Sequence, residues 1–212
     1  MFGFDLRRRR DRAERSRLDR FDTATAHLGA DDASDRIAGV RAMADLADEW
    51  DWRGRQDCID SLCGYLRAYR QDDQDVRRTI TRVISARLQA DGGVHWSAHD
   101  FQFRGATLED VDFRGAVFGS ADFEGVKFCG TANFARTTFY ETPSFVLAEF
   151  DGNADFSDAT FDWVSFQHVL DRPVGAEQCP VRRGLRRVTR RGCRPDGAHA
   201  SQRHCRPGLR AR

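Results

Sequence analysis

A large apolar residue recurs every five or six positions in the middle of this chain, thirteen times in succession. Twelve of the sixteen phenylalanines lie on this ladder. A fixed internal period is typical of stacked repeats, and it matches neither a helix, whose buried face recurs about every 3.6 residues, nor a strand, whose face recurs about every 2 residues. The spacing therefore predicts a solenoid of stacked strands. The ladder consists of Phe103, Leu108, Phe113, Phe118, Phe123, Phe128, Phe134, Phe139, Phe145, Phe150, Phe156, Phe161 and Phe166.

The position two residues before each ladder residue is usually small or β-branched. Alanine fills seven of these thirteen positions, namely Ala106, Ala116, Ala121, Ala132, Ala148, Ala154 and Ala159. The remaining positions are mostly polar, so each unit reads small, polar, Phe, polar, polar. We predict that the ladder residues and these alanines point inward and have a structural role. The recurrent aspartates are expected to form a solvated outer face.

The units ADFEG at 121–125, ANFAR at 132–136 and ADFSD at 154–158 resemble the repeats of the pentapeptide-repeat family. In that family each repeat forms one side of a square coil, and four repeats make one turn of a right-handed quadrilateral β-helix. The resemblance covers about residues 99–170 and implies about three coils. Parallel strands about 4.8 Å apart would give a stack only roughly 15 Å tall, with two ends that need caps.

Three spacings of six residues interrupt the period, between 128 and 134, 139 and 145, and 150 and 156. We expect each extra residue to be absorbed as a bulge at a corner. Phe101 stands where a small residue is usual, and we predict that it covers the first coil.

Residues 21–92 carry apolar residues at helical spacing in three stripes, at 37–50, 59–66 and 76–88. A further helix is expected from about Arg10 to Leu28, and the short links predict packed antiparallel neighbours. The segments at 28–32, 36–47 and 58–67 resemble a helical region that precedes pentapeptide repeats in many actinobacterial proteins. That region is similar to a HEAT or armadillo helical pair. The predicted fold class is α+β, with a small helical unit followed by the β-helix.

The net charge of +1 is strongly segregated along the chain. It is +4 for residues 1–20, −4 for 21–97, −9 for 98–171 and +10 for 172–212. We therefore predict four units. They are a basic N-terminal arm or helix start at 1–20, the helical unit at 21–92, the β-helix at 98–170 and a disordered arginine-rich tail at 171–212. Two other interpretations of the tail are an out-of-frame end and a basic arm for nucleic-acid phosphates.

No catalytic, cofactor or metal residue is predicted, and the chain is not expected to be an enzyme. It contains no phosphate loop, dinucleotide fingerprint, metalloprotease motif or EF-hand. His199 and His204 have a zinc-finger spacing but lack the close cysteine pair. No run of eighteen apolar residues encodes a membrane helix, and no apolar stretch after Arg7–Arg10 forms a secretory signal. We expect a cytoplasmic protein whose cysteines are thiols, with Cys58 and Cys63 buried on a helix.

Three functions compete. The preferred one is a non-enzymatic scaffold for an unknown protein partner, because a solenoid offers rigid faces. The resemblance also implies a DNA-mimicking modulator of a type II topoisomerase, which the acidic repeat region fits, although the coil is short. Relatives of the helical region often carry membrane helices, which implies a membrane-associated regulator that has lost its transmembrane segment. Self-association through the C-terminal end of the β-helix is expected, a weak membrane contact is an alternative, and nucleic-acid binding is not expected.

Overall fold

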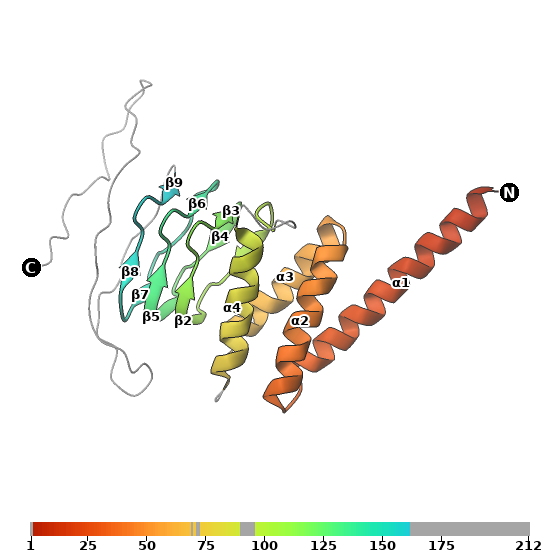
Figure 1. Ribbon diagram of the computed structural model, residues 1–212, viewed down its shortest axis with the longest axis horizontal. Helices are drawn as coiled ribbons and strands as arrows, with labels where there is room; N and C mark the ends of the chain where they lie inside the picture. Colours follow the sequence, from red (N-terminus) through yellow and green to blue (C-terminus); the bar gives the residue numbers. More distant parts are fainter. Residues whose placement is uncertain (1, 69, 71–72, 90–95, 162–212) are drawn as a thin grey trace, which may run out of the picture.

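The computed structural model describes residues 2–68, 70, 73–89 and 96–161, in which four helices precede a stack of short parallel strands (Figure 1). The helices are α1 (Phe2–Leu28), α2 (Ala33–Glu49), α3 (Trp52–Arg67) and α4 (Gln74–Leu88). The strands are β1 (Asp100–Gln102), β2 (Thr107–Asp112), β3 (Val117–Phe118), β4 (Ser120–Asp122), β5 (Lys127–Asn133), β6 (Thr138–Phe139), β7 (Glu149–Phe150), β8 (Ala154–Asp155) and β9 (Thr160–Phe161). The α+β class is confirmed. The predicted tail at 171–212 and Phe166 lie outside the described residues.

The three predicted apolar stripes are the buried faces of α2, α3 and α4. Val40, Ile59 and Ile80, one from each helix, are fully buried. Aspartates begin two of the helices, because the Asp32 and Asp51 side chains accept hydrogen bonds from backbone N–H groups of the first turn. These three helices form the compact part of the bundle.

Helix α1 differs from the expected helix at its start. It begins at Phe2 rather than near Arg10, and it passes residue 20 without a break. Alternating arginines and acids at i, i+3 and i, i+4 spacing support such a polar helix, as in the Arg17–Glu14 pair. Residues 2–20 are therefore the first part of one long helix.

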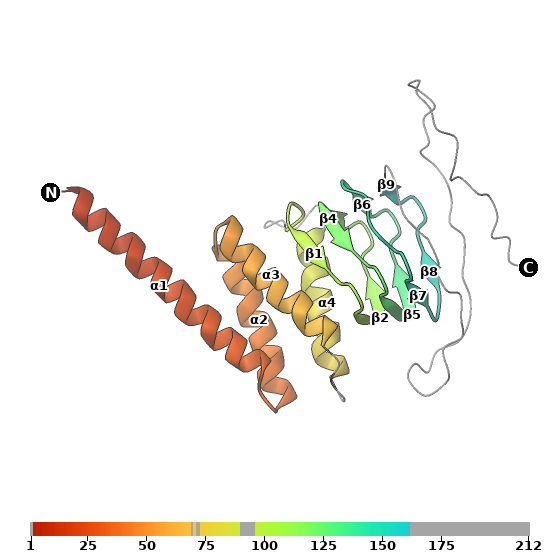
Figure 2. The ribbon, with the colours of Figure 1, turned by 180° about the vertical axis from the view of Figure 1, so that it is seen from behind.

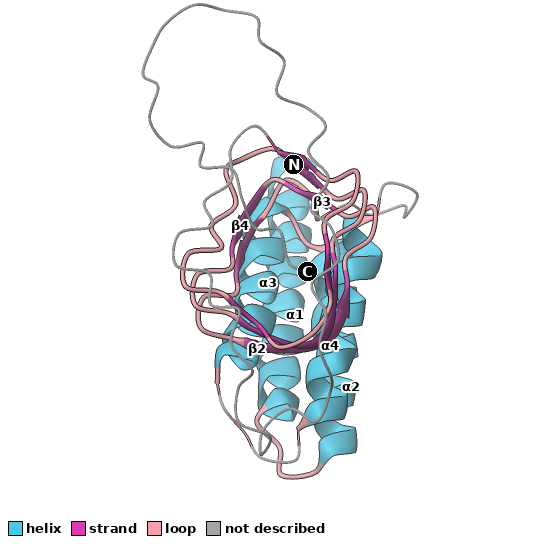
Figure 3. Ribbon diagram, turned by 90° about the vertical axis from the view of Figure 1, so that its left-hand side faces the viewer, coloured by secondary structure: helices cyan, strands magenta, loops and turns pink. Residues whose placement is uncertain are grey.

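The strands stack in parallel with a fixed register. Leu108 pairs with Phe128, which pairs with Phe150, and Phe118 pairs with Phe139, which pairs with Phe161. Each residue thus stacks on the ladder residue four repeats away, so one turn of the coil takes four repeats. Viewed along the stack, the strands enclose a single core (Figure 3).

The corners explain the polar and glycine positions of the repeat. The residue two places after the ladder residue has positive φ at several corners, and glycine adopts this conformation without steric cost, as at Gly125 with φ 63°. Before it, the Asp122 side chain accepts a hydrogen bond from the Glu124 N–H at 2.9 Å. Asp112, Asn133 and Asp155 make the same bond in their own repeats. These side chains are at least partly exposed on the outside of the coil, and they also cap its turns.

The first six-residue spacing is a bulge, as expected. The β2–β5 register shifts between Glu109 and Val111, where Gly130 and Thr131 of β5 lie opposite Asp110 alone. A side chain at Gly152, one coil further, would collide with the Gly130 carbonyl oxygen. Stacked bulges therefore require close backbone approach at this corner.

A buried ionic group joins the helices. The Arg36 guanidinium contacts the Asp73 carboxylate at 3.1 Å and donates to the Ala30 carbonyl at 3.0 Å, and the Tyr65 hydroxyl donates to Asp73 at 2.5 Å. These contacts connect the α1–α2 link, α2, α3 and the start of α4. Burial, together with the bond to Asp73, raises the pKa of Tyr65 to about 12.

Candidate interaction surface

The predicted inward residues lie in the coil interior wherever the structure describes them. The ladder from Phe103 to Phe156 is buried, and Phe161 is partly exposed. Six of the seven alanines are buried and Ala159 is partly exposed. Adjacent rings are in contact, as in the stack of Phe103, Phe123 and Phe145 with centroid distances of 5.1 and 4.8 Å. These side chains hold the coil together and are not available to a partner.

Side chains of α3 cover the first strand of the coil. The Gln56 amide donates to the Asp100 carbonyl at 2.9 Å and accepts from the Asp100 N–H at 3.0 Å. It therefore pairs with β1 as a neighbouring strand would. Arg67 donates to the Gln102 carbonyl at 2.8 Å, on the same side of the coil.

Residues of α4 and the segment after it cover the other sides of the first coil. Arg77 donates to the Thr107 carbonyl at 2.8 Å and Ser85 donates to the Asp112 carbonyl at 2.5 Å. Gln89 forms an isolated antiparallel bridge with Ala116. Every strand row of the first coil thus meets a helix side chain or the Gln89 bridge, which satisfies edge groups that would otherwise recruit another strand.

Trp96 and Phe101 complete this junction. The Trp96 indole N–H donates to Asp48 at 2.9 Å, and the Arg87 guanidinium lies 5.1 Å from the Trp96 ring while it also contacts Asp48 at 2.7 Å. Phe101 is fully buried against Phe118, with ring centroids 5.6 Å apart. Phe101 was predicted to cover the first coil, and Trp96 lies beside it at the junction with the helices.

Three sides of the coil carry charged side chains that pair among themselves. Arg104 contacts Asp122 at 3.1 Å and Glu124 at 2.5 Å in the next coil. On a second side Lys127 lies 3.9 Å from Glu149, and on a third Arg114 contacts Asp112 at 2.7 Å. Exposed pairs of this kind contribute little stability, because water and salt screen the attraction between the charges.

The fourth side, formed by β3, β6 and β9, is uncharged in the part of the chain that the structure describes. Its outward residues form one row of Val117, Thr138 and Thr160 and a second row of Gly119 and Tyr140, and the backbone of Ser97 and Ala98 lies against Gly119. The Tyr140 side chain is 71% exposed, the largest value among the described large hydrophobic residues. We call these five residues the uncharged face. Protein interfaces are depleted of charge and enriched in tyrosine at their centres, and this face has both properties.

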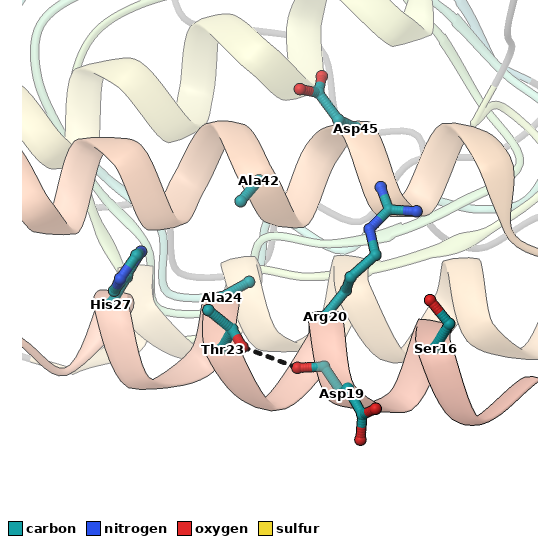
Figure 4. A pocket seen from close by; sticks show the side chains of 8 residues that line it. All are labelled: Ser16, Asp19, Arg20, Thr23, Ala24, His27, Ala42 and Asp45. Carbon is teal, nitrogen blue, oxygen red and sulfur yellow. Dashed lines mark hydrogen bonds between the residues drawn. The ribbon is translucent and has the colours of Figure 1, made fainter.

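A groove of about 440 Å³ lies between α1 and α2 (Figure 4). Ala24 and Ala42 line it together with Asp19, Asp45 and His27. Ser16, Arg20 and Thr23 complete the lining, and the Thr23 hydroxyl donates to the Asp19 carbonyl at 2.8 Å.

The cysteines differ from one another. Cys58 and Cys63 are free and fully buried, and burial raises the pKa of each thiol to about 12, so neither is a nucleophile at neutral pH. Cys129 is disulfide-bonded, so the expectation of thiols throughout is wrong at this position. In the described residues no group of three His, Cys, Asp or Glu side chains could hold a metal ion. None of the described helices is long and apolar enough to cross a membrane.

His99 is a junction residue whose role the sequence did not indicate. It is 1% exposed, its ring stacks on Trp52 at 4.0 Å, and its Nδ1 lies 3.2 Å from the Gln56 oxygen that also holds β1. Burial, and then the Arg55 charge, lower the pKa of His99 below 6.5, against smaller opposing effects of Asp100 and Asp60.

Acid should therefore loosen this junction. Above pH 6.5 the imidazole is neutral in the folded and unfolded chains, and its full contribution to stability is present. As the pH falls below 6.5 through the lowered pKa, the unfolded chain binds the proton first and that contribution is lost. We expect thermal melting to show a larger loss between pH 7.5 and 5.0 for the wild type than for His99→Gln. The exposed His27→Gln variant should behave as the wild type, and an equal loss in all three proteins would refute the role of His99.

Two family models match the coil. One, described as pentapeptide repeats in nine copies, matches residues 123–170, and the other, described as pentapeptide repeats in eight copies, matches residues 102–131. No curated protein and no solved structure matches the chain. The matches overlap at residues 123–131 and together cover residues 102–170, from the last residue of β1 onward.

Proposed function

Because residues 102–170 place this chain in the pentapeptide-repeat family, we propose that it is a non-enzymatic repeat protein that serves as a protein-interaction scaffold. The observation that carries the proposal is the uncharged face, where Tyr140 projects from a registered three-strand sheet. A preformed sheet loses little conformational entropy when it binds. With strands about 4.8 Å apart the face is small, which suits a transient partner better than a permanent one.

We propose further that the coil is a right-handed quadrilateral β-helix and that the helices form a HEAT- or armadillo-like unit. The register of four repeats per turn supports the first statement. The packing of α1 on α2 and of α2 on α3, across short links, supports the second. In this arrangement the helical unit covers one end of the coil and leaves its sides open to a partner.

DNA mimicry is the less favoured function. The coil is acidic, but Asp112, Asp122 and Asp155 accept turn hydrogen bonds, and Arg104 neutralises two acids of one side. About three coils give a height of roughly 15 Å, less than half of one B-DNA turn of about 34 Å. The acidic residues therefore have structural reasons to be present.

The scaffold proposal is tested with two matched full-length variants. Tyr140→Glu places a charge on the uncharged face, and Gln102→Glu places the same charge at an exposed position of a charged side. Each protein serves as bait in lysate of the source cells, and retained proteins are quantified by mass spectrometry. We expect one protein to be retained by the wild type and by Gln102→Glu, and to fall at least about tenfold with Tyr140→Glu, because a buried unpaired charge costs several kcal/mol.

Equal retention by both variants would refute the uncharged face as the binding surface. A type II topoisomerase retained by all three proteins would favour mimicry. Self-association through the coil end near Phe161 also stays a proposal, and a strictly monomeric species at high concentration would refute it. A cytoplasmic location stays a prediction.

A further inference from the structure

The first part of α1 lies apart from the core of the helical unit. Ala24 and Leu28 are buried against α2, and the last long-range contact toward the N-terminus is the Arg20–Glu49 ion pair at 2.6 Å. No side chain from residue 7 to residue 20 is buried. This part of α1 extends away from the bundle at the end opposite the coil (Figures 1 and 2).

This projecting segment is strongly basic. Residues 7–20 contain eight arginines and three acidic residues, a net charge of +5. Within the described part of the chain, Arg7, Arg8, Arg10 and Arg15 form no ion pair or hydrogen bond. A helix that is polar all round and packs on nothing is unusual in a globular unit. Its free guanidinium groups favour an anionic partner.

The arginines nearest the N-terminus form a ring. Residues 7–10 are four consecutive arginines in helical conformation, and each is exposed. Successive residues turn by about 100° and rise by about 1.5 Å, so the four side chains leave the helix in four directions at nearly one level. The sequence before the ring is Phe-Gly-Phe-Asp-Leu, and the sequence after it is highly charged.

We propose that this arginine ring docks α1 end-on against an anionic lipid surface. A ring at one level suits a plane that the helix axis meets, and the sequence before the ring contains Phe2, Phe4 and Leu6, residue types that suit a bilayer interface. A helix lying flat on a membrane needs an apolar stripe, which residues 7–20 lack. A helix in a duplex groove would use Arg12, Arg15, Arg17 and Arg20 as well as the ring, so the DNA arm of the test below separates the two anionic partners. This contact lies apart from the scaffold face of the coil and does not depend on it.

The test compares two double variants of the full chain. Arg8→Gln/Arg10→Gln removes half of the ring, and Arg15→Gln/Arg17→Gln removes the same charge further along the same helix. The second pair lies about 10–13 Å from the ring along the axis, beyond the screening length of about 8 Å at physiological salt. Co-sedimentation uses phosphatidylcholine vesicles with and without about one third phosphatidylglycerol, and a fluorescent 20-base-pair DNA serves as the other anion.

We expect the wild type to bind the anionic vesicles alone. One arginine at an anionic surface raises the affinity roughly fivefold, so the ring variant should bind about 25-fold more weakly. The Arg15→Gln/Arg17→Gln variant should bind less than about threefold more weakly. Circular dichroism should show equal melting of all three proteins, because neither pair contributes to the core. Equal weakening by both pairs would overturn the end-on contact. Three results would overturn the proposal of an anionic lipid partner. They are equal binding to neutral vesicles, no binding to any vesicle, and ring-dependent binding that is tighter to DNA than to vesicles.

Discussion

Replacing Phe123 by alanine should lower the free energy of unfolding by about 3–5 kcal/mol, the largest effect we expect in the coil. Phe123 is fully buried in the middle of the stack, between the rings of Phe103 and Phe145. The ring centroids of these residues lie 5.1 and 4.8 Å from the Phe123 centroid. Its ring also contacts neighbours on the other sides of the coil, such as Phe134 at 5.5 Å. Truncation removes these contacts and leaves a cavity that a stack of fixed register cannot close.

Thermal and urea unfolding of the full chain would measure this loss. Phe134→Ala should cost a similar amount, because Phe134 stacks on Phe156 at 4.9 Å in the same way. Tyr140→Ala is the matched control, since its aromatic ring is mostly exposed and should contribute less than about 0.5 kcal/mol. Wild-type stability of both phenylalanine variants would show that the ladder is not the core.

The second large effect is expected in the helical unit. Asp73→Ala should cost about 3–5 kcal/mol, because it leaves the buried Arg36 charge without its carboxylate. The Asp73 side chain is 0% exposed and the Arg36 side chain 9% exposed. The Tyr65 hydroxyl would also lose its acceptor. No other described carboxylate bonds to these two groups, so the variant cannot repair the contact locally.

Glu49→Ala provides the matched comparison for this pair. It breaks an ion pair of similar length, Arg20–Glu49 at 2.6 Å, in which both side chains are largely exposed. Because water screens this exposed pair, we expect a much smaller loss of stability for Glu49→Ala than for Asp73→Ala. If urea unfolding gave equal losses for the two variants, the Arg36, Asp73 and Tyr65 group would not be the structural link that its burial indicates.

The coil could be predicted from sequence because its constraint repeats. Every inward position must fill the same narrow interior, so Phe113, Phe134 and Phe156 look alike although they belong to different turns. The buried faces of α2, α3 and α4 could be predicted for the same reason, since burial imposes a period on the sequence. The bulge at Gly130 followed from one extra residue in that period.

The junction could not be predicted, because its residues carry no period. Gln56 looks like an ordinary polar residue of an exposed helix face, and only the fold brings its amide to the backbone of Asp100, forty-four residues later. His99 likewise belongs to no sequence motif, although in the fold its ring stacks on Trp52. The sequence predicts a start of α1 near Arg10 rather than at Phe2, because the charged first turns of this helix carry no apolar stripe. The uncharged face appears only when residues of different turns are aligned in register.

The central claim is that the helical unit covers the first coil and makes it as stable as the coil beyond it. Backbone hydrogen exchange of the full chain, measured by mass spectrometry, tests this most directly. Peptides covering 100–108 should exchange as slowly as those covering 120–128, because Gln56, Arg67 and Arg77 bond the first coil on the side opposite β4 and β5. Exchange of the first coil on the order of a hundredfold faster than the second, with the helices still protected, would contradict the claim.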